Sequence, residues 1–473
     1  MWSKISIAQI QELELQLGSN VFKPGSCEFS TSTKRWSSIG NQTPGVVVIP
    51  ETADHVARTV VFVKKYEIDF AVKGGGHSTD TSASTEGGIL LDLCRLNRVI
   101  VCPETKTLAI EGGALWSDVN EAAALHDLAV VGGTVSQTGV GGLTLRGGYG
   151  YLTPQYGLAI DNLLKAKVIT PDGSILDVSD TENSDLFWAL RGAGQNFAIV
   201  VEFVFQGYSQ HNEVWNGTIT YHPNQLSEVV QALNSALFHV DGKAAAQCVF
   251  SLSPENEEPL ITTVLFFNGS EKEGRHHFQM LLSIACIEEN MQMKPYLEAN
   301  TLLNALVPPG GPKKLLGVQL ATPLRAEFAF SLLETITIKL KNEPDLRQSC
   351  LELDFFDPTQ ICKTSVTDTA FPRRDDCLNG ALILQWKDSA NNSEYISWGE
   401  TIQMMCVEEM ERTKNESPSF VSNFVGYTKD NGRTPKEMFG VNADRLLSIK
   451  RKYDPDNLFC NLNPLSLSLT ESE

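Results

Sequence analysis

The sequence lacks several features that would place it in a protein class at once. None of its ten cysteines stands in a Cys-x-x-Cys pair, so neither a zinc ribbon nor a dithiol redox site is indicated. No stretch of about 20 apolar residues occurs that could span a membrane. The 38 basic residues are outnumbered by 57 acidic ones, and the resulting formal charge of −19 disfavours nucleic acids, anionic membranes and anionic substrates as partners.

The N-terminus shows no secretory signal. Ile10, Leu13 and Leu17 recur at helical spacing after Ser6, which predicts a capped amphipathic helix, and interspersed glutamine and glutamate residues break the apolar core that a signal peptide requires. We therefore expect a cytoplasmic protein with free thiols. Its 473 residues, 42% hydrophobic and 20% charged, are sufficient for two globular domains.

Glycine is concentrated in two runs. The first, KGGGHS at residues 73–78, closes an apolar stretch, and the second, GVGGLTLRGGYG, occupies residues 139–150. Consecutive glycines let the backbone take positive φ and bring its N–H groups close to an anion. The two runs together predict a site for a large phosphate-bearing cofactor.

Two common nucleotide sites do not fit these runs. A Rossmann turn would lead directly into an amphipathic helix, yet residues 78–88 (STDTSASTEGG) have no apolar period of 3.6. A Walker loop would end in Gly-Lys-Ser or Gly-Lys-Thr, and neither run does. The sequence therefore argues against nicotinamide dinucleotides and P-loop nucleotides.

Several blocks of sequence share a resemblance that spans nearly the whole chain. They are KGGGHS at 73–78, GGILLDL at 87–93, GVGGLTLRGGYG at 139–150, YGLAIDN at 156–162, DLFWALRGAGQNF at 185–197 and KYDPDNLF at 452–459. In these blocks the sequence resembles the FAD-linked oxidases of the berberine bridge enzyme-like group, in the vanillyl-alcohol oxidase superfamily. The resemblance implies an α+β, two-domain PCMH-type FAD-binding fold with an inserted substrate domain, an antiparallel sheet covered by helices.

The pattern of elements along the chain agrees with this division. A strand at 46–49, a helix capped by Thr52 and a strand at 70–72 predict a βαβ unit, and a further helix is expected at 115–128. Later segments predict alternating strands and helices: strands at 215–221, 248–252, 261–267, 351–356 and 381–386, and helices at 225–238, 275–285 and 442–452. We place the FAD-binding domain at 1–207 and 426–473 and the substrate domain at 208–425, with the C-terminal segment returning to the cofactor.

The resemblance implies FAD as the cofactor, attached covalently through His77, and no metal. Members of the group with two covalent bonds carry a cysteine where this chain has Val135, so a single bond is expected. The positions that match the family's cofactor site are His77, Lys73, Gly74, Gly75, Gly76, Ser78, Thr138, Gly139, Gly141, Gly142, Leu143, Gly147, Gly148, Tyr149, Gly150, Asp161, Asn162, Gly192, Gly194, Asn196, Ile199, Val200, Asn461 and Asn463.

Some positions around the cofactor differ from the family pattern. Lys73 replaces the more usual arginine, so the pyrophosphate would meet a point charge in place of a bidentate fork. Ala198 and Val201 replace the more usual glycine and threonine near the adenine. Thr138 falls where related oxidases keep a small gate residue, which favours access of dioxygen. A β-branched residue that merely packs a turn is the alternative interpretation of Thr138.

No catalytic base can be assigned from the sequence. Plant alkaloid-type members of the group place a glutamate in the C-terminal loop at the position of Leu462. Asn461 and Asn463 flank it and are suited to hydrogen bonds with flavin, substrate or their own loop. Tyr221 or Tyr427 would act as a base only beside a group that lowers the pKa of the phenol. We expect the base in the inserted domain.

The resulting hypothesis is an FAD oxidase. A small organic substrate, of the kind found in secondary metabolism, gives a hydride to the flavin, and dioxygen then takes up the electrons and leaves as hydrogen peroxide. The alternatives are a flavin-containing cyclase or isomerase without net oxidation and a flavin-binding protein without turnover. Sugar, alkaloid, phenol and polyketide substrates all stay open, as does the oligomeric state.

Overall fold

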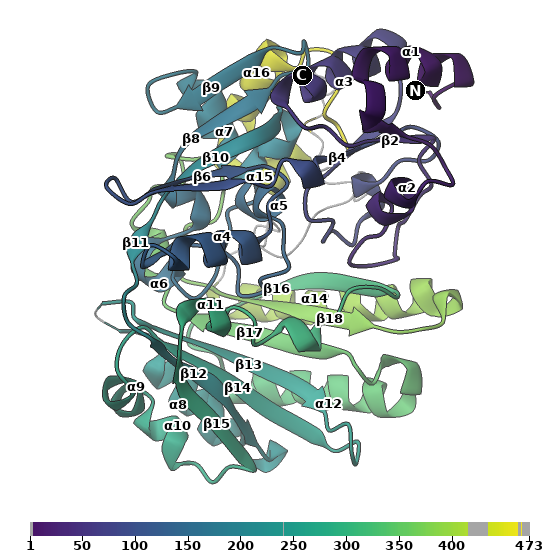
Figure 1. Ribbon diagram of the computed structural model, residues 1–473. Coiled ribbons are helices and arrows are strands. Elements are labelled where there is room, and N and C mark those ends of the chain that lie inside the picture. The colour runs from purple at the N-terminus through teal and green to yellow at the C-terminus, as the bar shows by residue number, and fades with distance from the viewer. Residues whose placement is uncertain (1–2, 240, 415–433, 462–464, 466–473) are drawn as a thin grey trace, which may run out of the picture.

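The computed structural model describes residues 3–239, 241–414, 434–461 and 465 (Figure 1). A four-stranded and a five-stranded sheet form the upper part of Figure 1, which we call the cofactor half, and a seven-stranded sheet, the large sheet, lies below them. Helices α1 (Ile7–Leu17) and α16 (Ala443–Tyr453), near the two ends of the chain, both lie in the upper part. The predicted two-domain α+β fold is confirmed, whereas the exact domain boundaries remain predictions.

The first glycine run leaves the carboxyl end of a parallel strand. The four-stranded sheet has the order β1 (Val21–Phe22), β2 (Val46–Val48), β4 (Ile89–Asp92), β3 (Phe70–Lys73), and only β1 is antiparallel to its neighbour. Helix α3 (Ala53–Tyr66), capped by Thr52 as predicted, connects β2 to β3. The predicted βαβ unit forms, but its strands are not neighbours, because β4 pairs with both of them. Ligands of open parallel sheets bind at this carboxyl edge.

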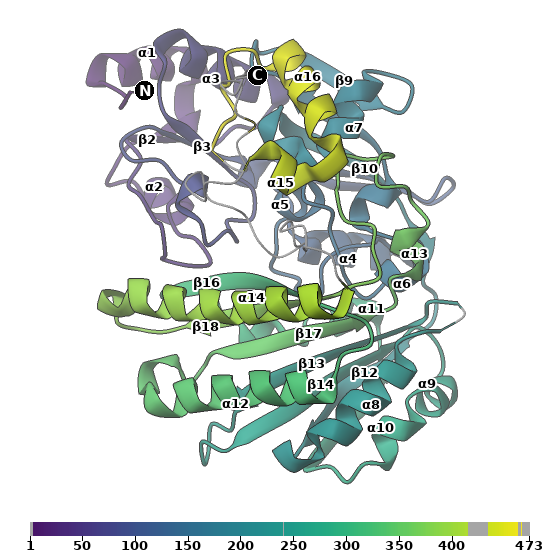
Figure 2. The ribbon, with the colours of Figure 1, turned by 180° about the vertical axis from the view of Figure 1, so that it is seen from behind.

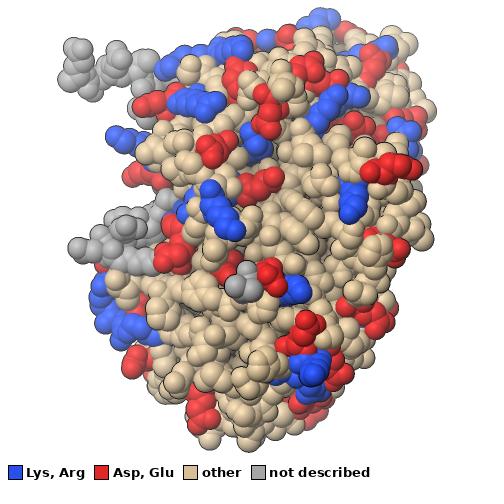
Figure 3. All heavy atoms as spheres, turned by 90° about the vertical axis from the view of Figure 1, so that its left-hand side faces the viewer, with Lys and Arg blue, Asp and Glu red and all other residues tan. Residues whose placement is uncertain are grey.

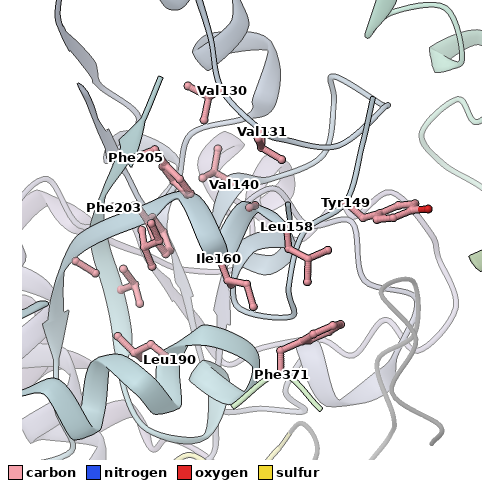
Figure 4. Close-up of a cluster of buried hydrophobic side chains, with 14 of the residues drawn as sticks. Val130, Val131, Val140, Tyr149, Leu158, Ile160, Leu190, Phe203, Phe205 and Phe371 are labelled. Atoms are coloured by element: carbon pink, nitrogen blue, oxygen red, sulfur yellow. The ribbon is translucent and has the colours of Figure 1, made fainter. Parts of the chain in front are cut away.

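The second sheet is antiparallel and supports the second glycine run. Its order is β5 (Val99–Cys102), β6 (Thr107–Glu111), β10 (Ile199–Gln206), β8 (Leu163–Ile169), β9 (Ile175–Ser179). Val140 of the glycine run packs with Phe203 and Phe205 of β10 in one buried cluster (Figure 4). The short helices α5 (Val140–Thr144) and α6 (Thr153–Tyr156) flank the rest of this run.

Helix α4 (Trp116–Ala124) is shorter than the helix predicted at 115–128. The chain leaves the helix because Asp127 adopts a φ of 52°, which aspartate tolerates better than most residues, and Leu128–Ala129 then forms strand β7. Strand β7 pairs with β11 (Tyr208–Ser209), the last strand before the large sheet. Helix α7 (Ser184–Ala193) lies farther along, between β9 and β10.

The large sheet is antiparallel and has one face covered by helices. Its order is β15 (Glu288–Lys294), β12 (Val214–Tyr221), β14 (Pro259–Phe267), β13 (Ala244–Leu252), β17 (Cys350–Phe356), β18 (Leu378–Gln385), β16 (Lys313–Leu320). Helices α8 (Leu226–Ala236), α12 (Ala326–Asn342) and α14 (Asn392–Lys414) lie over one face (Figure 2). Since side chains alternate along a strand, every second residue of the large sheet points toward the cofactor half.

Two smaller differences concern helices around the large sheet. The helix predicted at 275–285 is two helices, α9 (Glu271–His277) and α10 (Gln279–Ser283), separated at Phe278, whose ψ of 20° is not helical. Several helices of the described residues were not predicted. They are α5, α6, α7, α12 and α14, given above, and also α2 (Cys27–Ser32), α11 (Tyr296–Ala299), α13 (Thr359–Cys362) and α15 (Pro435–Phe439).

The C-terminal segment returns to the cofactor half, as predicted, and one buried lysine holds it there. Lys450 of α16 is completely buried, and its ammonium donates to Asp454 Oδ2 at 2.6 Å, to the carbonyl of Asn196 at 2.7 Å and to the carbonyl of Phe459 at 2.8 Å. Three acceptors around one buried ammonium offset the cost of its desolvation. The contact connects the segment before Ile199 to the chain end near Asn461.

Acidic and basic side chains are intermixed over the face shown in Figure 3. None of the ten cysteines, all of which lie within the described residues, forms a disulfide. Among the helices of the described residues, none has the length and apolar character needed to cross a membrane.

Candidate active site

The two glycine runs meet backbone to backbone. A Cβ atom on Gly75 would lie 2.5 Å from the nitrogen of Gly139, and one on Gly139 would lie 2.4 Å from the nitrogen of Gly75. No side chain fits at either position, since real Cβ atoms do not approach other atoms so closely. The runs therefore form one structure, and glycine is required by the contact itself.

We predict that Gly75→Ala destabilises this junction and lowers the flavin content of the purified protein at least tenfold, because the methyl group would meet backbone atoms that cannot move aside. Gly440→Ala, at the exposed position that follows α15 and outside the cavity lining, is the control, since a Cβ there has no atom within 4 Å. Its positive φ costs some stability, but its flavin content should stay normal. Flavin absorbance per protein and the melting temperature measure both effects. A Gly75→Ala protein with normal flavin content would contradict the role assigned to the junction.

A cavity of about 870 Å³, counted to its open mouth, lies beside this junction. Six of the residues predicted at the cofactor line it, namely Gly74, Gly141, Gly142, Ile199, Val200 and Asn461. Asn461 is fixed by donating from Nδ2 to the carbonyl of Phe70 at 2.9 Å. The cavity thus joins both glycine runs, strand β10 and the C-terminal segment.

A second group of predicted residues packs against other parts of the chain. Gly147 and Gly148 adopt φ values of 110° and 76°, which favour glycine. The remaining members of this group are in close contact with neighbours: Leu143 with Gly133 and Gly148, Gly150 with Gly132, Gly192 with Phe371, and Gly194 with Leu145. Figure 4 shows Phe371 beneath Leu158 and Ile160. These glycines let segments approach one another around the cavity.

A third group of predicted residues is polar, and their side chains bond to other residues of the protein. The ammonium of Lys73 bonds to Asp92 Oδ2 at 3.1 Å and to the carbonyl of Ser32 at 2.9 Å. Asp161 accepts two hydrogen bonds of 2.7 Å from Arg374. Asn162 donates to the carbonyls of Tyr156 and Leu158, and Asn196 donates to that of Ala193. Direct contacts of these side chains with the cofactor stay predictions.

His77 stands at the end of the first glycine run, between Gly76, whose φ is 70°, and Ser78, whose Oγ accepts from the backbone of Asp80. Its ring stacks on Trp36, with centroids 4.3 Å apart and planes 13° apart. Burial, together with the nearby charge of Lys313, lowers the pKa of His77 to about 4. Its Nε2 is buried and has no hydrogen-bond partner among the described residues. At neutral pH the ring is therefore an uncharged base with an unused nitrogen.

Thr138 directly precedes Gly139 and so lies at the junction of the glycine runs. Its nitrogen bonds to the carbonyl of Val135, and its carbonyl accepts from Trp116. Val135 packs against a buried cluster on the large sheet that includes Trp36, Val249 and Ala381. The tight turn from 135 to 138 therefore reaches from the large sheet to the glycine junction, and the role of Thr138 at the flavin stays a prediction.

A pair of buried carboxyl groups lies on the large sheet. Glu352 and Asp354 of β17 are 8% and 1% exposed, and Gln247 of β13 donates from Nε2 to both, at 2.9 Å to Asp354 Oδ1. Burial raises the pKa of Glu352 to about 7, and burial together with the charge of Glu352 raises that of Asp354 well above its usual value. Asp354 Oδ2 has no hydrogen-bond partner among the described residues. The pair holds a proton that it can exchange near neutral pH.

The carboxyl pair faces the cofactor half. Glu352 lies directly between Val249 and Ala381 on the neighbouring strands, so the three side chains share one face. Val249 and Ala381 pack in the cluster that contains Trp36, the residue stacked on His77. The pair is thereby placed on the same side of the sheet as the histidine and the glycine junction.

Tyr149 connects the second glycine run to the same face. Its ring stacks on Phe356 of β17 at 4.8 Å, and its phenol interacts with Asn379 of β18. Figure 4 shows Tyr149 extending away from the other labelled side chains. Burial, and next the charge of Asp354, raise the pKa of the phenol well above its usual value. Tyr149 therefore forms an aromatic, neutral wall next to the carboxyl pair.

Three basic side chains lie near Asp80, which follows His77 by three residues in the sequence. Asp80 binds Lys314 at 2.8 Å, and its carbonyl accepts from Arg35 at 2.9 Å. The side chain of Arg146 makes no hydrogen bond or ion pair with a described residue, and burial lowers its pKa while Asp80 partly offsets this. Arg146 is thus a cation without a fixed partner in the described part of the chain.

Sequence reasoning named some candidate bases that the structure does not support. The phenol of Tyr221 donates to the carbonyl of Leu281 on the helix side of the large sheet, and burial raises its pKa. Tyr221 is therefore not suited to accept a proton. Tyr427, Leu462 and Asn463 lie outside the described residues. The carboxyl pair was missed, although two acids separated by one residue in an apolar strand, Leu351–Phe356, signal one polar face.

Two family models match the chain. One is described as an FAD binding domain and matches residues 44–179, and the other, described as berberine and berberine like, matches residues 423–465. The first covers both glycine runs and His77.

Relatives match over almost the full length. The FAD-linked oxidoreductase pgmH of Aspergillus terreus is 28% identical over 93% of this chain and 91% of its own length. (R)-6-hydroxynicotine oxidase of Paenarthrobacter nicotinovorans is 28% identical over 94% of this chain and 96% of its own length.

Solved structures share the fold. 6-Hydroxy-D-nicotine oxidase of Arthrobacter nicotinovorans has a TM-score of 0.79 at 26% identity and covers 95% of this chain and 98% of its own. Glucooligosaccharide oxidase of Acremonium strictum, which is described with a 6-S-cysteinyl, 8α-N1-histidyl FAD, has a TM-score of 0.82 at 22% identity, with 97% and 99% covered.

Proposed function

Since the chain belongs to the berberine bridge enzyme-like, PCMH-type FAD-linked oxidoreductases, we propose that it is an oxidase with FAD bound covalently through His77 alone. The substrate proposed is a small organic molecule of the kind found in secondary metabolism, and dioxygen is the final electron acceptor. The observation that carries the proposal is the buried Nε2 of a neutral His77, which has no hydrogen-bond partner among the described residues.

The residues present fit the cofactor. The junction of Gly75 and Gly139 leaves backbone alone beside the cavity, as the approach of a large anionic ligand requires. A histidine that is to bond to carbon must be uncharged, and the low pKa of His77 meets this condition. Val135 offers no sulfur for a second bond. Bound FAD would supply hydride acceptance and the transfer of electrons to dioxygen.

The chain's own residues would position the substrate and take its proton. We assign the proton acceptor to the pair of Glu352 and Asp354, because burial raises the pKa of Glu352 to about 7 and that of Asp354 well above its usual value, and because the pair lies on the face turned toward His77. Gln247 fixes both carboxyl groups, and Tyr151 in turn donates to Gln247 Oε1 at 3.2 Å. Tyr149 and Phe356 would exclude water and pack against an apolar part of the substrate.

Peroxide release tests this function. Purified protein is mixed with sugars, alkaloids, phenols and polyketides, and flavin bleaching without oxygen is followed by peroxide formation in air. Bleaching and peroxide with the same compound support an oxidase. Conversion of a compound without either signal would favour the cyclase or isomerase instead, and the carboxyl pair would then move protons within one substrate.

Thr138 gives a prediction about dioxygen. Thr138→Leu is expected to leave flavin reduction unchanged and to slow reoxidation in air about tenfold, a barrier increase of about 1.4 kcal/mol, because the larger side chain fills the space at the glycine junction. Thr138→Ser keeps the small size and should reoxidise normally. Stopped-flow absorbance separates the two half-reactions. Unchanged reoxidation in Thr138→Leu would show that this residue only packs its turn.

A further inference from the structure

Trp36 is the only ring that stacks on His77 among the described residues. It lies between α2 and β2, far from His77 in the sequence, and is 4% exposed. The two rings are nearly parallel, with planes 13° apart. One face of the imidazole is therefore covered by the indole.

The indole itself is held from both halves of the molecule. The backbone nitrogen of Trp36 donates to the carbonyl of Gly76 at 3.0 Å, next to His77, and its carbonyl accepts from Gly310 at 2.9 Å. Its Nε1 donates to the carbonyl of Val307 at 2.8 Å. With both its backbone and its ring bonded, Trp36 has no freedom to turn, and it connects the histidine loop to the segment that leads into β16.

The carbonyl of Val307 also binds the second glycine run. Gln137, the neighbour of Thr138, donates from Nε2 to it at 2.7 Å. One carbonyl oxygen thus accepts hydrogen bonds from residues beside both glycine runs, and the position of Trp36 is set relative to the junction as well as to His77.

The stack restricts His77 in two ways that matter for bond formation. The indole blocks rotation of the imidazole and excludes water from one face, so the unused Nε2 keeps a fixed direction. Exclusion of water also opposes protonation, and Lys313, with its ammonium 5.5 Å from the indole centroid, adds to this effect.

We propose that Trp36 is a positioning residue for the covalent attachment of FAD: it holds the His77 ring in the orientation and the neutral form that bond formation needs. This rests on the proposed covalent link. In the net reaction, an N–H bond of the imidazole and a C–H bond of the flavin 8α-methyl group break and a C–N bond forms. The two protons and two electrons released reduce dioxygen to hydrogen peroxide.

Attachment kinetics test the proposal. Protein made without flavin is mixed with FAD in air, and the acid-stable flavin fraction is followed over time together with total bound flavin. For Trp36→Leu we expect attachment at least tenfold slower than in the wild type, with total bound flavin within about twofold, because the cavity residues are unchanged. Trp36→Phe restores a ring and should recover most of the wild-type rate.

Trp386→Leu is the matched control, because Trp386 is also 4% exposed and donates from its indole nitrogen, to Asn392, but lies away from His77. Its attachment rate should equal that of the wild type whatever its stability. If Trp36→Leu does not fold, Trp36→Met, which fills similar space without a ring, takes its place.

Two results separate failure of this inference from failure of the proposed function. Wild-type protein without acid-stable flavin would overturn the covalent link itself. Wild-type protein with acid-stable flavin, together with Trp36→Leu or Trp36→Met attaching flavin at the normal rate, would overturn the role of Trp36 alone.

Discussion

Replacement of His77 by alanine is expected to move all of the flavin from the protein pellet to the supernatant on acid precipitation. The wild-type pellet should be yellow, because a carbon–nitrogen bond survives acid while hydrogen bonds to the cofactor do not. At the position where related proteins form a second link, this chain has Val135, whose side chain offers no nucleophile. The measurement is flavin absorbance in pellet and supernatant.

His277→Ala is the matched control for this experiment. Burial also lowers the pKa of His277, but its Nε2 is engaged by the carbonyl of Ala236 at 2.8 Å, on the helix side of the large sheet. This variant should keep a yellow pellet. Colour retained in the His77→Ala pellet would show that the flavin is linked elsewhere or is trapped without a bond.

The position of His77 could be predicted from the sequence because the signal is local. Consecutive glycines imply a backbone turn whatever surrounds them, and a histidine that follows them has no apolar neighbours to join. Each of the two glycine runs gives such a local signal, and in the structure the runs meet at Gly75 and Gly139. The fold class followed from the same blocks and from the alternation of strands after residue 207.

The partners of these residues could not be predicted, because they come from distant parts of the chain. Trp36 has no pattern that points to His77, and its place depends on carbonyl oxygens at Gly76 and Val307. The sequence predicted that Lys73 would meet the pyrophosphate. In the structure its ammonium forms an ion pair with Asp92 on the adjacent strand. Such contacts depend on which strands pair in space, and this pairing cannot be read from a single sequence.

The carboxyl pair shows which features can be predicted from the sequence and which cannot. The strand at 351–356 was predicted, and alternation already places Glu352 and Asp354 on one face. Which face points inward depends on the strands beside it, and only the pairing with Gln247 shows that both acids are buried and share one amide. The expectation that the base lies in the inserted domain agrees with the assignment of the pair, which stays a proposal.

The last prediction concerns this pair. Glu352→Gln and Asp354→Asn should each lower kcat/KM for an oxidised substrate by about 10²–10⁴-fold, the range for loss of a general base. In the wild type kcat/KM should rise with pH through about 7, because the acceptor must first lose its proton. Each variant should lose this dependence while keeping its covalent flavin. Glu288→Gln, on the exposed edge strand β15 of the same sheet, is the control and should behave as the wild type.

Stability gives the same pair an independent readout. The folded-state pKa of Glu352 is raised from 4.5 to about 7, so the folded protein binds more protons than the unfolded chain across this range. The contribution of Glu352 to the free energy of unfolding should therefore be greatest below pH 4.5 and should fall as the pH rises to about 7. Glu352→Gln removes the titrating group, and its stability curve should be flatter over this interval. Variants with normal turnover and an unchanged pH profile would show that the proton acceptor lies elsewhere, even if the stability curve flattens as expected.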